Sequence, residues 1–182
     1  WSISVFADRQ QLVLPWAPFD DSFYSRMRKV VPAGGTRLYS AVFSAHQALS
    51  AAPLRKRAIL LISDGNDVSS QITGDFSADL DTLTYAGSGE STATAALRRG
   101  EGLLYAFGMD WPYQPQPRTN ARGQSERVDG AALERLAHPT GGFVWMPKSR
   151  NELVSAAPEL MAELREQYTL AYTPRKAADG RY

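Results

Sequence analysis

The chain has 182 residues, of which 43% are hydrophobic and 21% charged, so we expect one globular domain, residues 1–182, with a sizeable core. The net charge of +1 gives no sign of a nucleic-acid or anionic-membrane partner, and no run approaches the ~20 apolar residues of a transmembrane helix. The absence of cysteine excludes disulfides, thiolate nucleophiles and cysteine-type zinc sites.

Two periodicities divide the chain into predicted strands and helices. Short apolar runs bounded by turn-forming residues are typical of strands, and apolar residues three or four positions apart are typical of helices. In the first half they predict a strand–turn–strand hairpin at 3–6 and 11–15, a short helix after 19–22, a helix from Leu38 to Leu49 and a strand at 57–63. In the second half they predict a helix at 92–99, a strand at 103–108, a helix that is capped by Asp129 and runs to Ala137, and a strand at 143–146. They also predict a helix that starts at Ser149, which stands at capping-box spacing from Glu152, with a kink or restart at Pro158, and a final strand at 168–172.

Strands that alternate with helices predict an α/β fold. We expect a Rossmann-like, doubly wound, mostly parallel sheet with helices on both faces and the N-terminal hairpin as an antiparallel edge. Two long polar segments, 64–91 and 110–129, each follow a predicted parallel strand. Both should therefore emerge at the carboxyl ends of the strands, where ligands bind in sheets of this kind.

The stretch from Ile59 to Asp67 is the most informative part of the chain. We interpret its apolar run as a fully buried strand that delivers the carboxylate of Asp64 to the rim of the sheet. Gly65 allows the sharp turn that must follow. Our hypothesis is that Asp64 ligates a divalent metal ion and that Thr36, in the loop Gly34-Gly35-Thr36, faces it.

Each of these residues also has a purely structural interpretation. Asp64 could cap the turn that follows it, and on spacing alone this is as well supported as a metal ligand. Thr36 could be the N-cap of the helix that starts at Leu38, a role that is compatible with metal binding because a hydroxyl oxygen has two lone pairs. Asp67 is more typical of a turn. Neither His46 nor His138 has a second ligand at metal-binding spacing, so both are interpreted as packing or helix-terminal residues.

Four landmarks occur in a characteristic order. They are Gly-Gly-Thr at 34–36, Ile-Ser-Asp-Gly-Asn-Asp at 62–67, Tyr-Ala-Phe-Gly at 105–108 and Leu-Ala-His-Pro-Thr-Gly-Gly-Phe at 136–143. Together they resemble a von Willebrand factor type A domain, and the resemblance covers nearly the whole chain. The segment Glu-Gln-Tyr-Thr-Leu-Ala-Tyr-Thr-Pro at 166–174 is similar to the end of a bacterial, typically exported subset of that family.

The resemblance implies a metal-ion-dependent adhesion site. In the family, three loops hold Mg²⁺ or a similar ion, such as Mn²⁺ or Ca²⁺, and an acidic side chain of a protein partner completes its coordination. The resemblance assigns Thr36 to the second loop and Asp64 to the third. The first loop, Asp-x-Ser-x-Ser after the first strand, is not found, so we expect a chain truncated at both ends that lacks a central strand. Two protein ligands are few for Mg²⁺, and we expect weak or no binding.

We therefore predict a non-enzymatic, extracytoplasmic domain that binds an acidic partner through a cation held by Thr36 and Asp64. The residues predicted to line the partner-binding rim are Gly35, Gly65, Asp67, Trp111 and Tyr113. The two aromatic residues could equally hold their own loop in place. One alternative is a Mg²⁺-dependent phosphoryl-transfer enzyme that uses Asp64 and Asp67, although the sequence has no glycine-rich phosphate loop with lysine. The other alternative is a structural module without metal binding.

Overall fold

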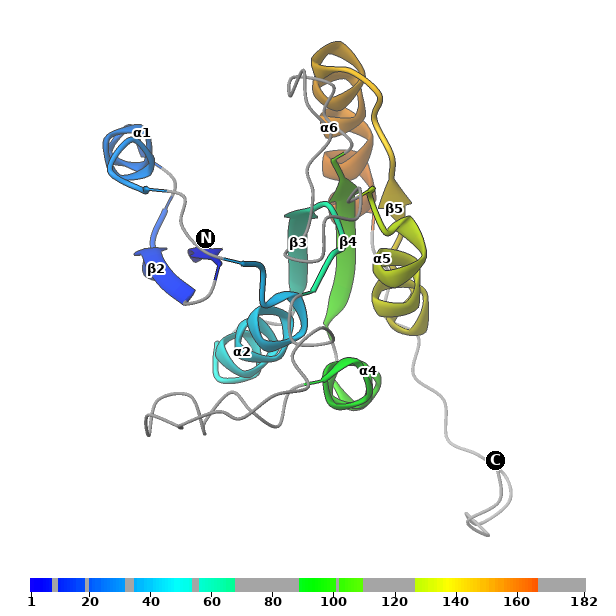
Figure 1. The fold of residues 1–182 in the computed structure, drawn as a ribbon. Coiled ribbons are helices and arrows are strands. Elements are labelled where there is room, and N and C mark those ends of the chain that lie inside the picture. The colour runs from blue at the N-terminus through cyan, green and yellow to red at the C-terminus, as the bar shows by residue number, and fades with distance from the viewer. Residues whose placement is uncertain are drawn as a thin grey trace, which may run out of the picture.

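The computed structural model shows an α/β fold built from two sheets and the helices around them (Figure 1). The structure describes residues 1–7, 10–18, 20–31, 35–53, 56–67, 89–100, 102–109 and 127–166. The strands are β1 (Ile3–Phe6), β2 (Gln10–Leu14), β3 (Ala58–Ser63), β4 (Leu103–Gly108) and β5 (Val144–Trp145). The helices are α1 (Ser22–Met27), α2 (Leu38–Ser50), α4 (Glu90–Arg99), α5 (Gly130–Ala137), the 3₁₀ turn η2 (His138–Thr140) and α6 (Arg150–Arg165).

Among the described residues, three strands form a parallel sheet in the order β3-β4-β5. β3 and β4 pair over their full length, from Ala58 opposite Leu103 to Ser63 opposite Gly108. The pairing extends one residue further, since the N–H of Met109 donates to the carbonyl of Ser63 at 3.0 Å. The carboxyl ends of both strands therefore lie together, and the chain that follows each of them leaves the sheet at one rim.

The two faces of this sheet pack against different helices, as expected for a doubly wound fold. One face forms the larger core with α2, α4 and α5, in which Leu38, Leu97, Leu104 and Leu133 are at most 2% exposed. The other face packs against α6 through a smaller cluster, comprising Tyr105 and Phe107 of β4 with Ala156 and Leu160 of α6. The fold class predicted from the sequence is confirmed.

The prediction that β3 is fully buried is wrong. Leu60 is 43% exposed and Ile62 is 54% exposed, although Leu61 between them is buried. Leu60 and Ile62 lie opposite Tyr105 and Phe107 in the register, so they face the α6 side of the sheet. α6 packs on β4 and Trp145, and its cluster reaches Ala58 at the start of β3 but, among the described residues, leaves Leu60 and Ile62 uncovered.

The N-terminal hairpin forms as predicted but is a sheet of its own. β1 pairs antiparallel with β2, and neither strand is hydrogen-bonded to β3, β4 or β5. The hairpin and α1 stand to one side of the parallel sheet (Figure 1). Phe6 at the end of β1 packs against the larger core, and α2 contacts both β1 and β3. α2 therefore connects the hairpin to the body of the molecule.

Most of the predicted elements occur within one or two residues of their expected bounds. α6 runs through Pro158 without the predicted restart. The strand predicted at 168–172 and most of the two long loops lie outside the described residues. No helix in the described part of the chain is long and apolar enough to cross a membrane.

Thr140 joins the end of α5 to the central strand. Its hydroxyl donates to the carbonyl of Ala137 at 2.7 Å and accepts from the N–H of Leu104 at 2.8 Å and of Gly142 at 3.3 Å. Leu104 is fully buried, so water cannot reach its N–H. The Thr140 hydroxyl is therefore the hydrogen-bond acceptor on which this N–H depends.

We predict that Thr140→Val destabilises the protein by about 1–3 kcal/mol, because valine keeps the shape but leaves the buried N–H of Leu104 without its acceptor. Thr140→Ser is the matched control, since it retains the hydroxyl, and should cost less than about 1 kcal/mol. Urea unfolding of the three proteins measures the difference. Equal destabilisation by serine and valine would show that the methyl group, not the hydroxyl, carries the effect.

Candidate functional site

Asp64 directly follows β3 at the rim formed by the carboxyl ends of the strands. Its side chain is partly exposed, and Oδ1 accepts the backbone N–H of Asn66 at 3.1 Å. This contact confirms that Asp64 caps the following turn. A carboxylate offers about four lone-pair sites, so the same side chain retains the capacity to ligate a cation.

The turn after Asp64 is packed against the start of α5. Gly65 has φ of +80°, and a Cβ placed on it would lie 2.2 Å from the backbone oxygen of Asp129. The carbonyl of Asp64 in turn accepts the N–H of Asp129 at 2.8 Å. Asp129 caps α5 by accepting from the N–H of Ala132 at 2.9 Å, as the sequence predicted. Gly65 is thus required by both its backbone conformation and its close neighbour.

Thr36 lies two residues before α2 and is partly exposed. The N-cap residue of α2 is Arg37, whose side chain makes no capping hydrogen bond. The prediction that Thr36 is the N-cap is therefore wrong. Thr36 stands one residue outside the position from which its hydroxyl would cap the helix.

Asp67 supplies the cap that the local sequence of α2 lacks. Its Oδ1 accepts the backbone N–H of Tyr39, in the first turn of α2, at 3.3 Å. The residue is only 6% exposed. Asp67 was predicted to line the partner-binding rim, but its burial places the carboxylate against α2 instead of at the surface. No motif within α2 could have revealed this contact, which joins residues 28 positions apart.

This hydrogen bond ties the two predicted ligand segments to each other. Thr36 lies three residues before Tyr39, and Asp64 lies three residues before Asp67, so the bond brings the start of α2 to the loop after β3. Gly35 and Gly65 lie in the same two segments. Trp111 and Tyr113 lie outside the described residues, although the chain leading to them leaves β4 beside Ser63.

The donor set fits a hard divalent cation in kind. Thr36 and Asp64 offer a hydroxyl and a carboxylate oxygen, which are the ligands that Mg²⁺ and Ca²⁺ prefer. In the described part of the chain no group of three or more His, Cys, Asp or Glu residues could hold a metal. A cation held by Thr36 and Asp64 would therefore keep most of its water.

Comparisons with known proteins give a likeness in three dimensions only. No protein-family model matches the chain, and no curated protein sequence does. The fold is similar to the crystal structure of a conserved hypothetical protein, BatB, from Bacteroides thetaiotaomicron, with a TM-score of 0.59 and 16% identity over 91% of this chain and 79% of that one. It is also similar to an aerotolerance-related membrane protein from Bacteroides fragilis, crystallised with multiple mutations to serines, with a TM-score of 0.61, 18% identity and the same coverage. The likeness is one of fold.

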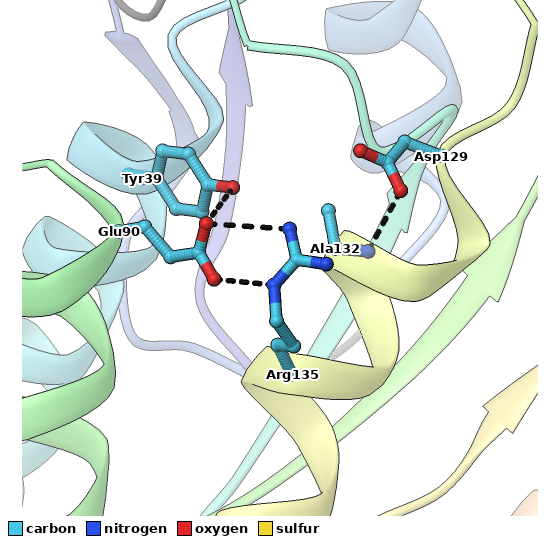
Figure 2. Close-up of polar contacts among 5 residues, drawn as sticks. All are labelled: Tyr39, Glu90, Asp129, Ala132 and Arg135. Carbon is cyan, nitrogen blue, oxygen red and sulfur yellow. Dashed lines mark hydrogen bonds and ion pairs between the residues drawn. The ribbon is translucent and has the colours of Figure 1, made fainter.

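A second polar cluster, not predicted from the sequence, joins three helices near this rim. The phenol of Tyr39 in α2 donates to Glu90 Oε2 in α4 at 3.0 Å, and the guanidinium of Arg135 in α5 binds both carboxylate oxygens of Glu90 (Figure 2). The hydrogen bond from Arg135 is the main cause that lowers the pKa of Glu90. Burial, then the Glu90 carboxylate, raises the pKa of Tyr39 to about 12. The cluster fixes α2 relative to α4 and α5.

His46 and His138 have the structural roles predicted for them. His46 Nε2 is buried and makes no hydrogen bond, and the ring packs so closely on Gly100 that a Cβ there would meet it at 2.1 Å. Burial lowers the pKa of His46. His138 caps the C-terminus of α5.

We predict that Gly65→Ala destabilises the protein by about 2–4 kcal/mol, because alanine is strained at this φ and its Cβ collides with the Asp129 carbonyl. Gly89→Ala is the control: no atom of the described residues lies within 4 Å of a Cβ at Gly89, so its cost should stay within about 1 kcal/mol. Urea midpoints of both variants provide the measurement. Similar midpoints for the two would contradict the close contact.

We predict that Tyr39→Phe costs about 1–2 kcal/mol at neutral pH through loss of the hydrogen bond to Glu90. Because the pKa of Tyr39 is raised in the folded protein, the unfolded chain ionises first, and this stabilisation is lost as pH rises from about 10 through 12. Urea unfolding across this range should therefore show the gap between wild type and Tyr39→Phe narrowing. Exposed Tyr24→Phe is the control. A gap that stays constant with pH would refute the raised pKa.

Proposed function

We propose that this domain binds a protein partner at the rim formed by the carboxyl ends of β3 and β4 and the start of α2. A divalent cation, held by the Thr36 hydroxyl and the Asp64 carboxylate, would bridge to an acidic side chain of the partner. The observation that carries the proposal is the hydrogen bond from Tyr39 to Asp67, because it connects the two segments that bear these donors.

The cation would supply positive charge at the rim. A hard cation with few protein ligands keeps exchangeable waters, and an Asp or Glu carboxylate of a partner can replace one of them. The chain's own contribution is to present one hydroxyl and one carboxylate on segments that the surrounding helices hold. The sequence resemblance to the adhesion-site family and the likeness of fold to the BatB structure both support this proposal.

The phosphoryl-transfer alternative has weaker support. It needs both Asp64 and Asp67 near a substrate, whereas the carboxylate of Asp67 is buried and accepts a backbone N–H of α2. A phosphate-ester substrate would therefore meet one accessible carboxylate of the two.

The metal site is tested with Mn²⁺, whose unpaired electrons broaden the NMR signals of nearby amides. We expect selective broadening of the Thr36, Asp64 and Gly65 amides, with a Kd on the order of 1 mM, and its loss in Asp64→Asn. Asp21→Asn is the matched control, because Asp21 is an exposed carboxylate at the N-cap of α1, which stands to one side of the parallel sheet (Figure 1), and makes no side-chain capping bond. Two results would contradict the metal-dependent proposal and favour a structural module. One is broadening of amides near exposed carboxylates in general, and the other is no broadening at Mn²⁺ concentrations up to about 10 mM.

Partner chemistry is tested by fluorescence anisotropy with labelled hexaglutamate, using hexaglutamine as the uncharged control. Binding of hexaglutamate that needs Mg²⁺, and that EDTA and Asp64→Asn both abolish, is the expected result. Equal binding in EDTA would mean that the rim attracts acidic peptides without a cation. Hydrolysis of p-nitrophenyl phosphate that Asp64→Asn abolishes would favour the enzyme instead.

We also propose an extracytoplasmic location. The resemblance of residues 166–174 to an exported subset of the family motivates it, and the description of one similar structure as a membrane protein supports a setting at the cell envelope. Fractionation of the native host with an antibody to this domain tests it, and recovery in the cytoplasm alone would contradict it.

A further inference from the structure

Asp67 is unusual among the charged residues of the described chain because it is buried. Ser40 and Asp67 are the polar residues with the least exposed area there, at 5% and 6%. A buried carboxylate is costly unless it accepts hydrogen bonds, and Asp67 accepts one from the N–H of Tyr39. The contact is therefore a buried one, and not an incidental surface interaction.

The start of α2 needs this carboxylate as much as the carboxylate needs the helix. The first turn of α2 contains no acidic residue, and Arg37 at the N-cap provides no side-chain acceptor. The N–H groups at a helix N-terminus lack partners within the helix and carry a partial positive charge. Asp67 provides an acceptor and a negative charge from a segment on another part of the chain.

The contact has a direct consequence for the two proposed ligands. The Thr36 segment continues into α2 within two residues, and Asp64 lies on the same short loop as Asp67. The start of that loop, at Asp64 and Gly65, is held against the N-terminus of α5 through Asp129. Because the loop contacts α5 at its start and α2 at Asp67, a shift of Asp67 should move the start of α2 relative to Asp64.

We infer that Asp67 is a positioning residue that sets the place of the Thr36 hydroxyl relative to the Asp64 carboxylate without itself contacting the cation. The inference rests on the proposed function. In this role Asp67 must keep an oxygen where Oδ1 accepts the N–H of Tyr39. The negative charge of Asp67 is not needed to bind the cation.

Two conservative variants separate geometry from charge. Asp67→Asn keeps an oxygen acceptor where Oδ1 lies but removes the charge, whereas Asp67→Glu keeps the charge and displaces the oxygen by one methylene. If Asp67 positions the site, Asp67→Glu should weaken Mn²⁺ binding about tenfold or more, and Asp67→Asn should stay within about threefold of wild type. Asp21→Glu and Asp21→Asn are the matched controls and should have no effect.

Mn²⁺ broadening of the Asp64 amide measures the affinity, and hydrogen exchange of the Tyr39 amide measures the cap. The expected result is that Asp67→Glu weakens Mn²⁺ binding and speeds hydrogen exchange of the Tyr39 amide. Asp67→Asn should change neither quantity strongly. Loss of Mn²⁺ binding in Asp67→Asn alone would make Asp67 a ligand through its charge. Faster exchange at Tyr39 with unchanged Mn²⁺ affinity would make it a helix cap only. Either outcome overturns the inference.

The failure of the proposed function gives a different result. In that case wild type binds no Mn²⁺, and the cation-free spectrum still tests Asp67. The Thr36 amide should then shift in Asp67→Glu and keep its position in Asp67→Asn if Asp67 sets the place of the Thr36 segment. An unmoved Thr36 amide in both variants would refute the positioning role independently of the metal.

Discussion

The hydrogen bond between the Tyr39 N–H and the Asp67 carboxylate determines how the rim of this domain is assembled. Parallel pairing of β3 and β4 places the loop after β3 at the rim, but pairing alone does not fix where the preceding helix begins. A buried carboxylate needs hydrogen-bond donors, and the N–H groups in the first turn of a helix need an acceptor. Because each satisfies the other, the start of α2 is fixed beside the loop that carries Asp64.

Elements whose cause is local could be predicted from the sequence. Asp129 and Ser149 stand three residues before the N–H groups that they cap, and the pattern of polar and apolar residues around them is contiguous. The turn at Asp64 and Gly65 is local as well, and the structure contains both the Asn66 contact and the positive φ. The strands and helices could be predicted for the same reason, since alternation of apolar residues and helical spacing can be recognised within a short stretch of sequence.

Features that depend on distant partners could not be predicted in this way. The Tyr39–Glu90 bond spans 51 positions and the Glu90–Arg135 pair spans 45, so no window includes both members. The exposure of Leu60 and Ile62 depends on which strands α6 covers, and an apolar run has the same composition whether one face or both are buried. Thr36 is a possible N-cap of α2 on sequence alone because it is the nearest suitable side chain, whereas in the structure Asp67 accepts the N–H of Tyr39.

A site with only two protein donors depends on how firmly those donors are held. When a cation binds to donors on mobile segments, ordering those segments costs free energy and lowers the affinity of the site. Donors on segments that are already fixed therefore bind a cation more tightly than donors on free loops. Here α2 is held by the larger core, by Asp67 and by the ion pair that reaches it through Tyr39, and the Asp64 loop is held by Asp129. In the proposed site, the polar contacts around the rim would therefore favour cation binding by holding the two donors in place, since none of these contacts adds a ligand.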